Sequence, residues 1–126
     1  MTTKAKVIAT TIDCDDPRAL AAFYAEVLGM PVQVAEDEYA AVGDGTWNLY
    51  FARLPERKPV AWPSDDKQFH IDLRVPDVEQ AVQDYLALGA TKPEFQPGVT
   101  DGNVGWIVMQ DPAGHVFCVC PEQSGS

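Results

Sequence analysis

The sequence contains no apolar run long enough to cross a bilayer and has few basic residues. Nine Lys and Arg residues stand against nineteen Asp and Glu residues, which gives a formal net charge of -10. A transmembrane helix needs about twenty consecutive apolar residues, and nucleic acids or anionic lipids are bound through clustered Lys and Arg. We therefore expect neither a membrane protein nor a nucleic-acid-binding protein.

Cysteine is also scarce. Cys14, Cys118 and Cys120 are an odd set without C-x-x-C spacing, which argues against a disulfide framework and a zinc ribbon. Cys118 and Cys120 lie two apart in a strand-like run and share a face, so we expect buried, reduced thiols. The first six residues show no basic-then-apolar pattern of a signal peptide, and we expect a cytoplasmic protein.

What is present is the pattern of a first strand and helix. Alternating residues over 7–12 predict a strand. Asp16 and Pro17 then predict a helix N-cap and first turn, and Gly29 predicts the helix end. The apolar residues between them recur at helical spacing: Leu20, Phe23, Tyr24, Val27 and Leu28. Three strand-like segments follow, at 31–35, 39–42 and 47–54.

The second half repeats this plan. Residues 69–75 alternate, and Asp77 with Gln80 predicts a capping box. The helical stripe comprises Val78, Ala81, Val82, Tyr85 and Leu88, and it ends at Gly89. Strand-like segments follow at 91–95, 105–110 and 116–120. The sequence therefore predicts two modules with the same order of elements, strand, helix and three strands.

The register of the two copies agrees closely. Asp16 and Asp77 are 61 residues apart, and so are Tyr24 and Tyr85. Residues 55–67 hold three prolines and several charges, which predicts a stiff, exposed linker. We expect one domain over residues 1–126, with module 1 at about 5–54 and module 2 at about 68–121.

These motifs resemble those of the vicinal oxygen chelate superfamily, which includes glyoxalase I, bleomycin-resistance proteins, fosfomycin-resistance enzymes and extradiol dioxygenases. The motifs that carry the resemblance are Asp16-Pro17 with Phe23-Tyr24 and Leu28-Gly29, Phe69-His70 with Asp77 and Leu88-Gly89, and Asp111-Pro112-Ala113-Gly114 with Phe117. Residues 49–59, with Arg53, Pro55 and Pro59, are similar to the glyoxalase-like subgroup. The resemblance implies an α+β fold of two βαβββ modules, with curled mixed sheets around a cavity, in a homodimer.

The resemblance also implies one divalent ion held at four strand positions, typically by His or Glu. Spacing from the motifs places these positions at Ala9, Leu49, His70 and Cys118, with Trp47 and Phe51 flanking Leu49 on the same face. Alanine and leucine offer no electron pair to a cation. We therefore expect no intact metal site and no cofactor. The alternative is a divalent ion (Ni, Zn, Mn or Fe) that uses His70 as a ligand.

Strand alternation predicts which side chains face the cavity. One expected row consists of His70, Asp72 and Arg74, and another of Trp47, Leu49, Phe51 and Arg53. Ala9, Thr11 and Asp13 form a third row, Val116, Cys118 and Cys120 a fourth, and Trp106 adds an aromatic wall. Aromatic contacts with a few orienting polar groups suit an organic ligand. An ion pair at a strand end explains Asp72 and Arg74 equally well, and core or interface packing explains the aromatic row.

Three functional hypotheses follow. The first is a non-catalytic protein that sequesters a small aromatic or cationic ligand, as bleomycin-resistance proteins do in antibiotic resistance. The second is a lyase, isomerase or dioxygenase in which His70 is the general base or a metal ligand. The third is an interaction module that keeps the fold without a pocket, in which Trp47 and Phe51 are packed core residues.

Overall fold

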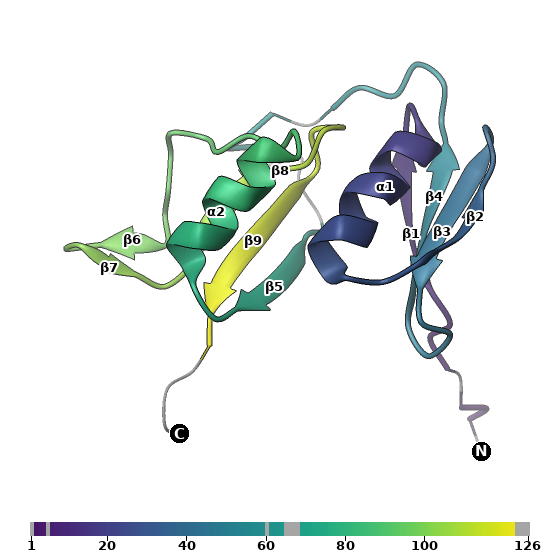
Figure 1. The fold of residues 1–126 in the computed structure, drawn as a ribbon, viewed down its shortest axis with the longest axis horizontal. Coiled ribbons are helices and arrows are strands. Elements are labelled where there is room, and N and C mark those ends of the chain that lie inside the picture. Colours follow the sequence, from purple (N-terminus) through teal and green to yellow (C-terminus); the bar gives the residue numbers. More distant parts are fainter. Residues whose placement is uncertain (1, 5, 60, 65–68, 123–126) are drawn as a thin grey trace. The chain divides into compact units, whose positions relative to one another are not determined.

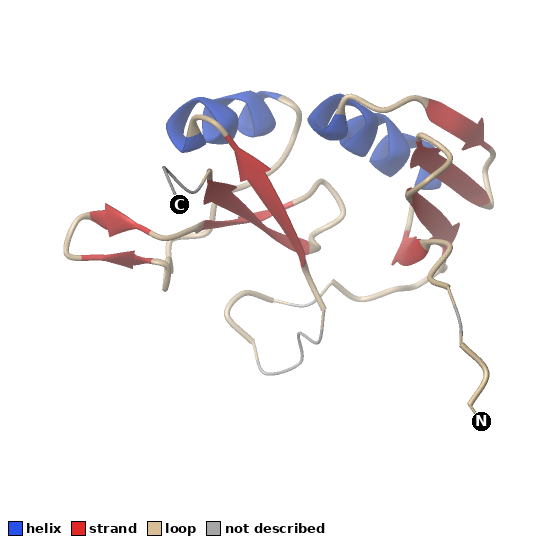
Figure 2. Ribbon diagram, turned by 90° about the horizontal axis from the view of Figure 1, so that it is seen from below, coloured by secondary structure: helices blue, strands red, loops and turns tan. Residues whose placement is uncertain are grey.

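The computed structural model describes residues 2–4, 6–59, 61–64 and 69–122, and the chain forms two compact units, residues 1–57 and 58–126. In each unit, one helix lies over one face of a small mixed sheet (Figures 1 and 2). This arrangement confirms the α+β class that the repeated pattern predicts. Among the described residues, no helix has the length and apolar character that crossing a membrane requires.

The first unit is a four-stranded sheet with one helix. Its elements are β1 (Thr10–Cys14), α1 (Pro17–Leu28), β2 (Val32–Ala35), β3 (Tyr39–Gly43) and β4 (Asn48–Arg53). The strand order is β1-β4-β3-β2, with β1 parallel to β4 and the other neighbours antiparallel. The chain from β1 to β4 runs through α1, β2 and β3, which provide the long crossover connection that a parallel pair of strands requires.

The second unit repeats this topology with one strand reduced. Its elements are β5 (Ile71–Val75), α2 (Val78–Ala87), β6 (Val99–Thr100), β7 (Asn103–Val104), β8 (Ile107–Gln110) and β9 (Val116–Pro121). The sheet has the order β5-β9-β8, and a single bridge from Thr91 to Gln110 occupies the place of β2. Strands β6 and β7 form a hairpin that projects from the sheet (Figure 1).

The caps of both helices explain where the helices begin and end. The side chain of Asp16 accepts a hydrogen bond from the Ala19 N–H at 3.2 Å, and Gly29 ends α1 with a φ of 64°. Asp77 accepts from the Gln80 N–H at 3.1 Å. The Gln80 side chain, however, donates to Asp84 at 2.9 Å, so only the Asp77 half of the expected capping box forms. Both predicted helix starts are confirmed.

Several strand boundaries differ from the prediction. Strand β1 begins at Thr10, and Val7 and Ile8 are 85% and 78% exposed. Likewise Phe69 is 90% exposed and β5 begins at Ile71. Residues 91–95 form no strand beyond the Thr91 bridge. Before β1 and β5, the alternation of apolar and polar residues begins earlier than the pairing with the neighbouring strand. The sequence pattern therefore predicted strands that start too early.

In each unit an aromatic side chain of the helix packs against an aromatic side chain of the last strand. Tyr24 of α1 stacks on Phe51 of β4, with ring centroids 5.6 Å apart. Tyr85 of α2 meets Phe117 of β9 edge to face at 6.1 Å. These contacts place the hydrophobic core of each unit between its helix and its sheet. The helix of each unit does not cover the opposite face of its sheet.

Candidate functional site

A pocket of about 310 Å³ lies in the second unit. It is on the face of the sheet opposite α2, because its strand residues alternate with Phe117 and Val119, which are core residues on the helix side. Four residues predicted from the sequence line it together: His70, Asp72, Trp106 and Cys118. The volume falls within the range of small-molecule sites.

Sheet register brings these residues together. Asp72 of β5 pairs with Cys118 of β9, and Cys118 pairs with Val108 of β8. Paired residues of adjacent strands point to the same face, so a row of three side chains crosses the sheet. Val108 and Cys118 are 1% and 5% exposed and form a buried apolar cluster with Val116. This cluster forms the floor of the pocket.

Five further residues line the pocket: Trp62, Pro97, Val108, Val116 and Cys120. Of these, Val116 and Cys120 belong to the predicted β9 row, whereas Trp62, Pro97 and Val108 were not anticipated. Trp62 lies in the segment predicted to be an exposed linker, part of which (residues 60 and 65–67) is outside the described residues. An indole within a polar, proline-rich connector was the available signal, because such a side chain tends to seek apolar contact.

The two tryptophans are held by specific contacts. The indole N–H of Trp62 donates to the carbonyl of Phe95 at 3.1 Å, and the two rings lie 6.2 Å apart. Trp106 lies against Gly98, where a Cβ atom would collide with the Trp106 carbonyl and ring. The Gly105 N–H also donates to the Gly98 carbonyl at 2.8 Å. Glycine at 98 therefore permits the close approach that sets the position of Trp106.

The polar part of the pocket is a compact group of three potential donor atoms. Nε2 of His70 lies 3.1 Å from Oδ1 of Asp72, and these side chains are 33% and 65% exposed. Together with the Cys118 thiol, their ligand atoms all lie within 4.8 Å of one another. A nitrogen, an oxygen and a sulfur donor in one cluster suit a borderline ion such as Zn²⁺. The residues present thus fit a three-ligand site.

Cys120 lies beside this group but differs from it electrostatically. Burial raises the pKa of the Cys120 thiol, the negative charge of Asp72 raises it further, and Arg74 acts in the opposite direction. Because the thiolate is the nucleophile and the metal ligand, a raised pKa keeps Cys120 protonated and weakly reactive at neutral pH. Its role in the pocket is therefore that of an apolar wall.

Two residues expected in the cavity row of the first unit are instead core residues. Leu49 and Phe51 are both fully buried, and Phe51 stacks on Tyr24 of α1. The predicted row was thus assigned to the wrong face of β4. The repeat shows the reason: Thr11 pairs with Tyr50, while Asp72, 61 residues after Thr11, pairs with Cys118. Tyr50, which is 39% exposed, is therefore the counterpart of Cys118, and Leu49 is not.

The remaining predicted residues lie outside the pocket. Trp47 is 39% exposed and precedes β4, at the end of a turn that Asp44 organises. Arg53 pairs with Glu38 at 3.5 Å on the surface of the first unit. Arg74 is in register with Cys120 but is not among the lining residues. The pocket therefore takes its described polar groups from His70, Asp72 and Cys118.

The comparisons with known proteins agree on the fold. The glyoxalase-like domain family matches residues 9–120. No curated protein matches the sequence significantly. A glyoxalase/bleomycin resistance protein/dioxygenase family enzyme from Burkholderia phytofirmans PsJN has a similar structure, with a TM-score of 0.69 and 19% identity over 93% of this chain and 98% of that chain.

Two further structures carry more specific names. The bleomycin-binding protein of Streptomyces verticillus, complexed with copper(II)-bleomycin, has a TM-score of 0.58 and 16% identity over 97% of this chain and 100% of its own. A lactoylglutathione lyase from Agrobacterium tumefaciens has a TM-score of 0.60 and 21% identity over 95% and 96% of the two chains. At these identities the likeness establishes the fold alone. With the family match over residues 9–120, it shows that the chain belongs to the glyoxalase-like domain family of the vicinal oxygen chelate superfamily.

Proposed function

We propose that this protein binds and sequesters a small organic ligand, aromatic or cationic in character, in the pocket of the second unit. The observation that carries the proposal is that two tryptophans, Trp62 and Trp106, line the same pocket of about 310 Å³ as His70 and Asp72. Indole faces provide apolar contact and cation–π attraction, and a carboxylate orients a positive group. An open pocket of this kind also argues against the interaction module without a pocket.

The proposed binding does not require a metal ion. In the first unit, the repeat counterparts of His70 and Cys118 are Ala9 and Tyr50. Alanine supplies no donor atom, and a neutral phenol is a weak ligand compared with imidazole or carboxylate. The family's four-ligand arrangement is therefore incomplete in this chain. To sequester a ligand, the pocket needs enough contact area with the ligand and polar groups that orient it, and it does not need a bound ion.

Binding is tested by tryptophan fluorescence and calorimetry, with metal-free bleomycin as a cationic aromatic probe. We expect quenching on titration, and Trp62→Ala and Trp106→Ala each to weaken binding by about tenfold because each removes a large apolar contact. Tyr39→Ala, an exposed residue of the first unit, is the control. Unchanged affinity in both tryptophan variants would refute the assignment, and Trp47→Ala tests whether the first unit contributes.

A second candidate function is a metal-dependent lyase, isomerase or dioxygenase. The observation that favours it is the cluster of His70, Asp72 and Cys118, with donor atoms within 4.8 Å. A divalent ion there would supply Lewis-acid activation of a substrate oxygen or a bound water. His70 could also act alone as a general base, with Asp72 at 3.1 Å orienting its imidazole.

Metal analysis after purification without chelators tests the metal-dependent form of the second candidate. This form requires near-stoichiometric Zn, Ni, Mn or Fe, lost in His70→Ala and in Cys118→Ser. Cys120→Ser is the matched control, because this neighbouring thiol is outside the three-donor group. An absence of bound metal, together with an unchanged melting temperature on adding each ion, would exclude the metal-dependent candidate.

We also expect a cytoplasmic homodimer. Strands β1 and β5 are each one of the two edge strands of their sheet. An exposed apolar residue lies two positions before each of them, Ile8 before β1 and Phe69 before β5. Such edges tend to pair with further strands. Light scattering coupled to size-exclusion chromatography measures the mass, and Phe69→Glu is expected to weaken a dimer that uses this edge. A monomer at micromolar concentration would contradict the expectation.

A further inference from the structure

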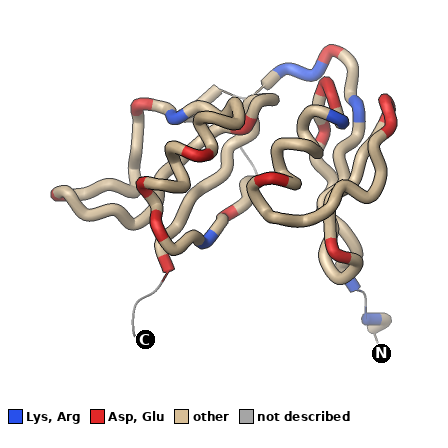
Figure 3. The backbone as a smooth tube through the Cα atoms, in the orientation of Figure 1, with Lys and Arg blue, Asp and Glu red and all other residues tan. Residues whose placement is uncertain are grey.

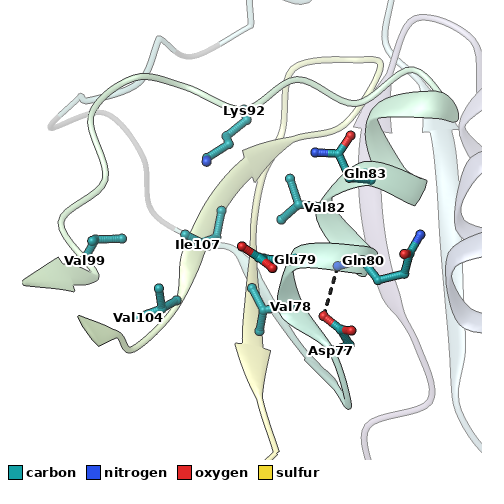
Figure 4. A pocket seen from close by; sticks show the side chains of 10 residues that line it. All are labelled: Asp77, Val78, Glu79, Gln80, Val82, Gln83, Lys92, Val99, Val104 and Ile107. Atoms are coloured by element: carbon teal, nitrogen blue, oxygen red, sulfur yellow. Dashed lines mark hydrogen bonds between the residues drawn. The ribbon is translucent and has the colours of Figure 1, made fainter. Parts of the chain in front are cut away.

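A second cavity, of about 590 Å³, lies on the other face of the same sheet. It is bounded by α2, the hairpin of β6 and β7, and the edge strand β8, and Figure 4 shows its lining residues. Ile107 points into it, whereas the next residue, Val108, lines the tryptophan pocket. The two cavities are therefore separate sites that share a strand.

The cavity exists because the two repeats differ at one strand. In the first unit, β2 pairs along β3, and α1 packs on both strands. In the second unit, only Thr91 pairs with β8, and α2 packs mainly on β9. The amide of Gln96 takes the place of the missing strand by hydrogen bonding to the N–H and carbonyl of Val108 at 2.8 and 2.9 Å. The space beside α2 that a strand would cover is left open.

The apolar part of this cavity's lining is aliphatic, and the remaining lining residues, Gln80 and Gln83 among them, are polar or charged. Its apolar lining residues are Val78, Val82, Val99, Val104 and Ile107. Val82 and Ile107 are each 6% exposed, so they provide a firm base, and Val99 and Val104 of the hairpin form a half-exposed wall. Branched aliphatic side chains favour an aliphatic ligand by shape and by apolar burial. The tryptophan pocket, by contrast, offers flat aromatic surfaces.

The rim carries one charge of each sign without an internal partner. In Figure 4, the Ile107 side chain lies between Lys92 and the Glu79 carboxylate. Among the described residues, neither Lys92 nor Glu79 forms an ion pair. The other acid of the rim, Asp77, is engaged as the cap of α2. Opposite charges left unpaired on both sides of an apolar floor are complementary to a ligand that carries both charges.

We propose that this cavity binds a small aliphatic zwitterion, of the class of branched aliphatic α-amino acids. Its ammonium group meets Glu79, its carboxylate meets Lys92, and its side chain covers Val82 and Ile107. A simple carboxylate gains Lys92 but is repelled by Glu79 and by the net charge of -10. A simple amine gains Glu79 and the attraction of the net charge, but it is repelled by Lys92 and leaves Lys92 without a partner. The site is independent of the ligand proposed for the tryptophan pocket.

The test uses L-leucine, 3-methylbutylamine and 4-methylpentanoate as probes of the full-length protein. Methyl NMR signals of Val82 and Ile107 report on this cavity, and the indole N–H signals of Trp62 and Trp106 report on the other one. We expect leucine to shift the Val82 and Ile107 signals saturably, and each singly charged analogue to bind about tenfold more weakly. Shifts confined to the indole signals, or no shift at the solubility limit of leucine, would overturn the proposal.

Charge variants separate recognition from simple filling of an apolar groove. Glu79→Gln and Lys92→Met should each weaken leucine binding about tenfold and remove the preference over one of the two analogues. Glu94→Gln and Lys58→Met are matched controls, since both residues are exposed and line neither cavity. An unchanged amide spectrum verifies the fold of each variant. A leucine affinity unchanged from that of the wild type in both the Glu79 and the Lys92 variants would refute the zwitterion assignment.

Discussion

Asp44 organises the turn between β3 and β4. Its Oδ1 accepts hydrogen bonds from the Thr46 hydroxyl at 2.6 Å, the Thr46 N–H at 2.9 Å and the Trp47 N–H at 3.1 Å. These hydrogen bonds, that of the Thr46 hydroxyl above all, lower the pKa of Asp44 from 3.8 to about 2. A single carboxylate thus stabilises the tight connection that presents Trp47 before β4.

This lowered pKa predicts a specific pH dependence. Because the folded-state pKa of Asp44 lies below its unfolded value, its stabilisation is complete above about pH 4 and is lost as the pH falls towards about 2. Asp44→Asn should lower the melting temperature at neutral pH and flatten the fall in stability over that acid range. Thermal unfolding at a series of pH values measures both effects. Asp101→Asn is the control, and identical acid profiles for Asp44→Asn and the wild type would contradict the prediction.

At the same scale, strand alternation and the spacing of motifs identified part of the pocket. The sequence predicted His70, Asp72, Trp106 and Cys118 as cavity residues, and the structure brings all four together. The sequence did not predict that Trp62 lines the pocket. The contacts of its indole with Val108 and Val116 leave no local sequence pattern in the connector. Such contacts join residues far apart in sequence, and only folding determines them.

At the scale of elements, the second unit shows how a strand can be replaced. The hairpin of β6 and β7 has a turn at Asp101 and Gly102, both with positive φ, at 50° and 79°. Asp-Gly is a favoured sequence for such a turn, so this hairpin was available from the sequence and was overlooked. The segment between α2 and the hairpin forms only the Thr91 bridge with β8. Its Gln96 side chain supplies further hydrogen bonds to the free edge of β8.

The Gln96 amide should contribute measurably to stability. Val108 is 1% exposed, and its N–H and carbonyl take their hydrogen bonds from Gln96. Gln96→Ala is expected to lower the free energy of unfolding by about 1–3 kcal/mol, the cost of buried polar groups without partners. Urea denaturation measures this change. Gln83→Ala, on the exposed side of α2, is the control, and an equal effect of the two substitutions would contradict the proposed role.

Gln96→Glu provides a sharper comparison. The carboxylate still accepts from the Val108 N–H but can no longer donate to the Val108 and Pro93 carbonyls, which the amide reaches at 2.9 and 2.8 Å. The stability of this variant should therefore fall between those of the wild type and Gln96→Ala near pH 4, where the carboxyl group is partly protonated. At neutral pH, the added charge near a buried strand lowers it further.

At the scale of the whole molecule, charge is the dominant feature. Asp and Glu recur along both units, whereas Lys and Arg are sparse (Figure 3). A net charge of -10 raises the local concentration of cations and lowers that of anions near the surface. This field favours a cationic ligand in the tryptophan pocket regardless of the detailed contacts.

Salt should therefore weaken the binding of a cationic probe. Raising the ionic strength from about 0.01 M to 0.15 M shortens the screening length from roughly 30 Å to 8 Å. We expect the affinity for metal-free bleomycin to fall several-fold over this range, while that for an uncharged aromatic such as indole stays constant. Calorimetry at both ionic strengths makes the comparison. A bleomycin affinity that is independent of salt would show that the overall charge does not contribute.

The sequence by itself determined both helices, most of the strands and the order in which they follow one another. Helix caps at Asp16 and Asp77, the apolar stripes between them and the 61-residue repeat are local signals, because each depends on neighbours along the chain. The same signals supported the assignment of the family. The turn residues between strands likewise act within a few positions, so they were readable without tertiary structure.

Tertiary structure alone decided which face of a strand is buried and which side chains share a pocket. The Leu49, Tyr50 and Phe51 run is apolar or aromatic throughout, and only packing against Tyr24 places Leu49 and Phe51 inside and Tyr50 outside. In the same way, the reduction of one strand to the Thr91 bridge opened the cavity beside α2. These outcomes depend on contacts between distant residues, whose energies no local pattern contains.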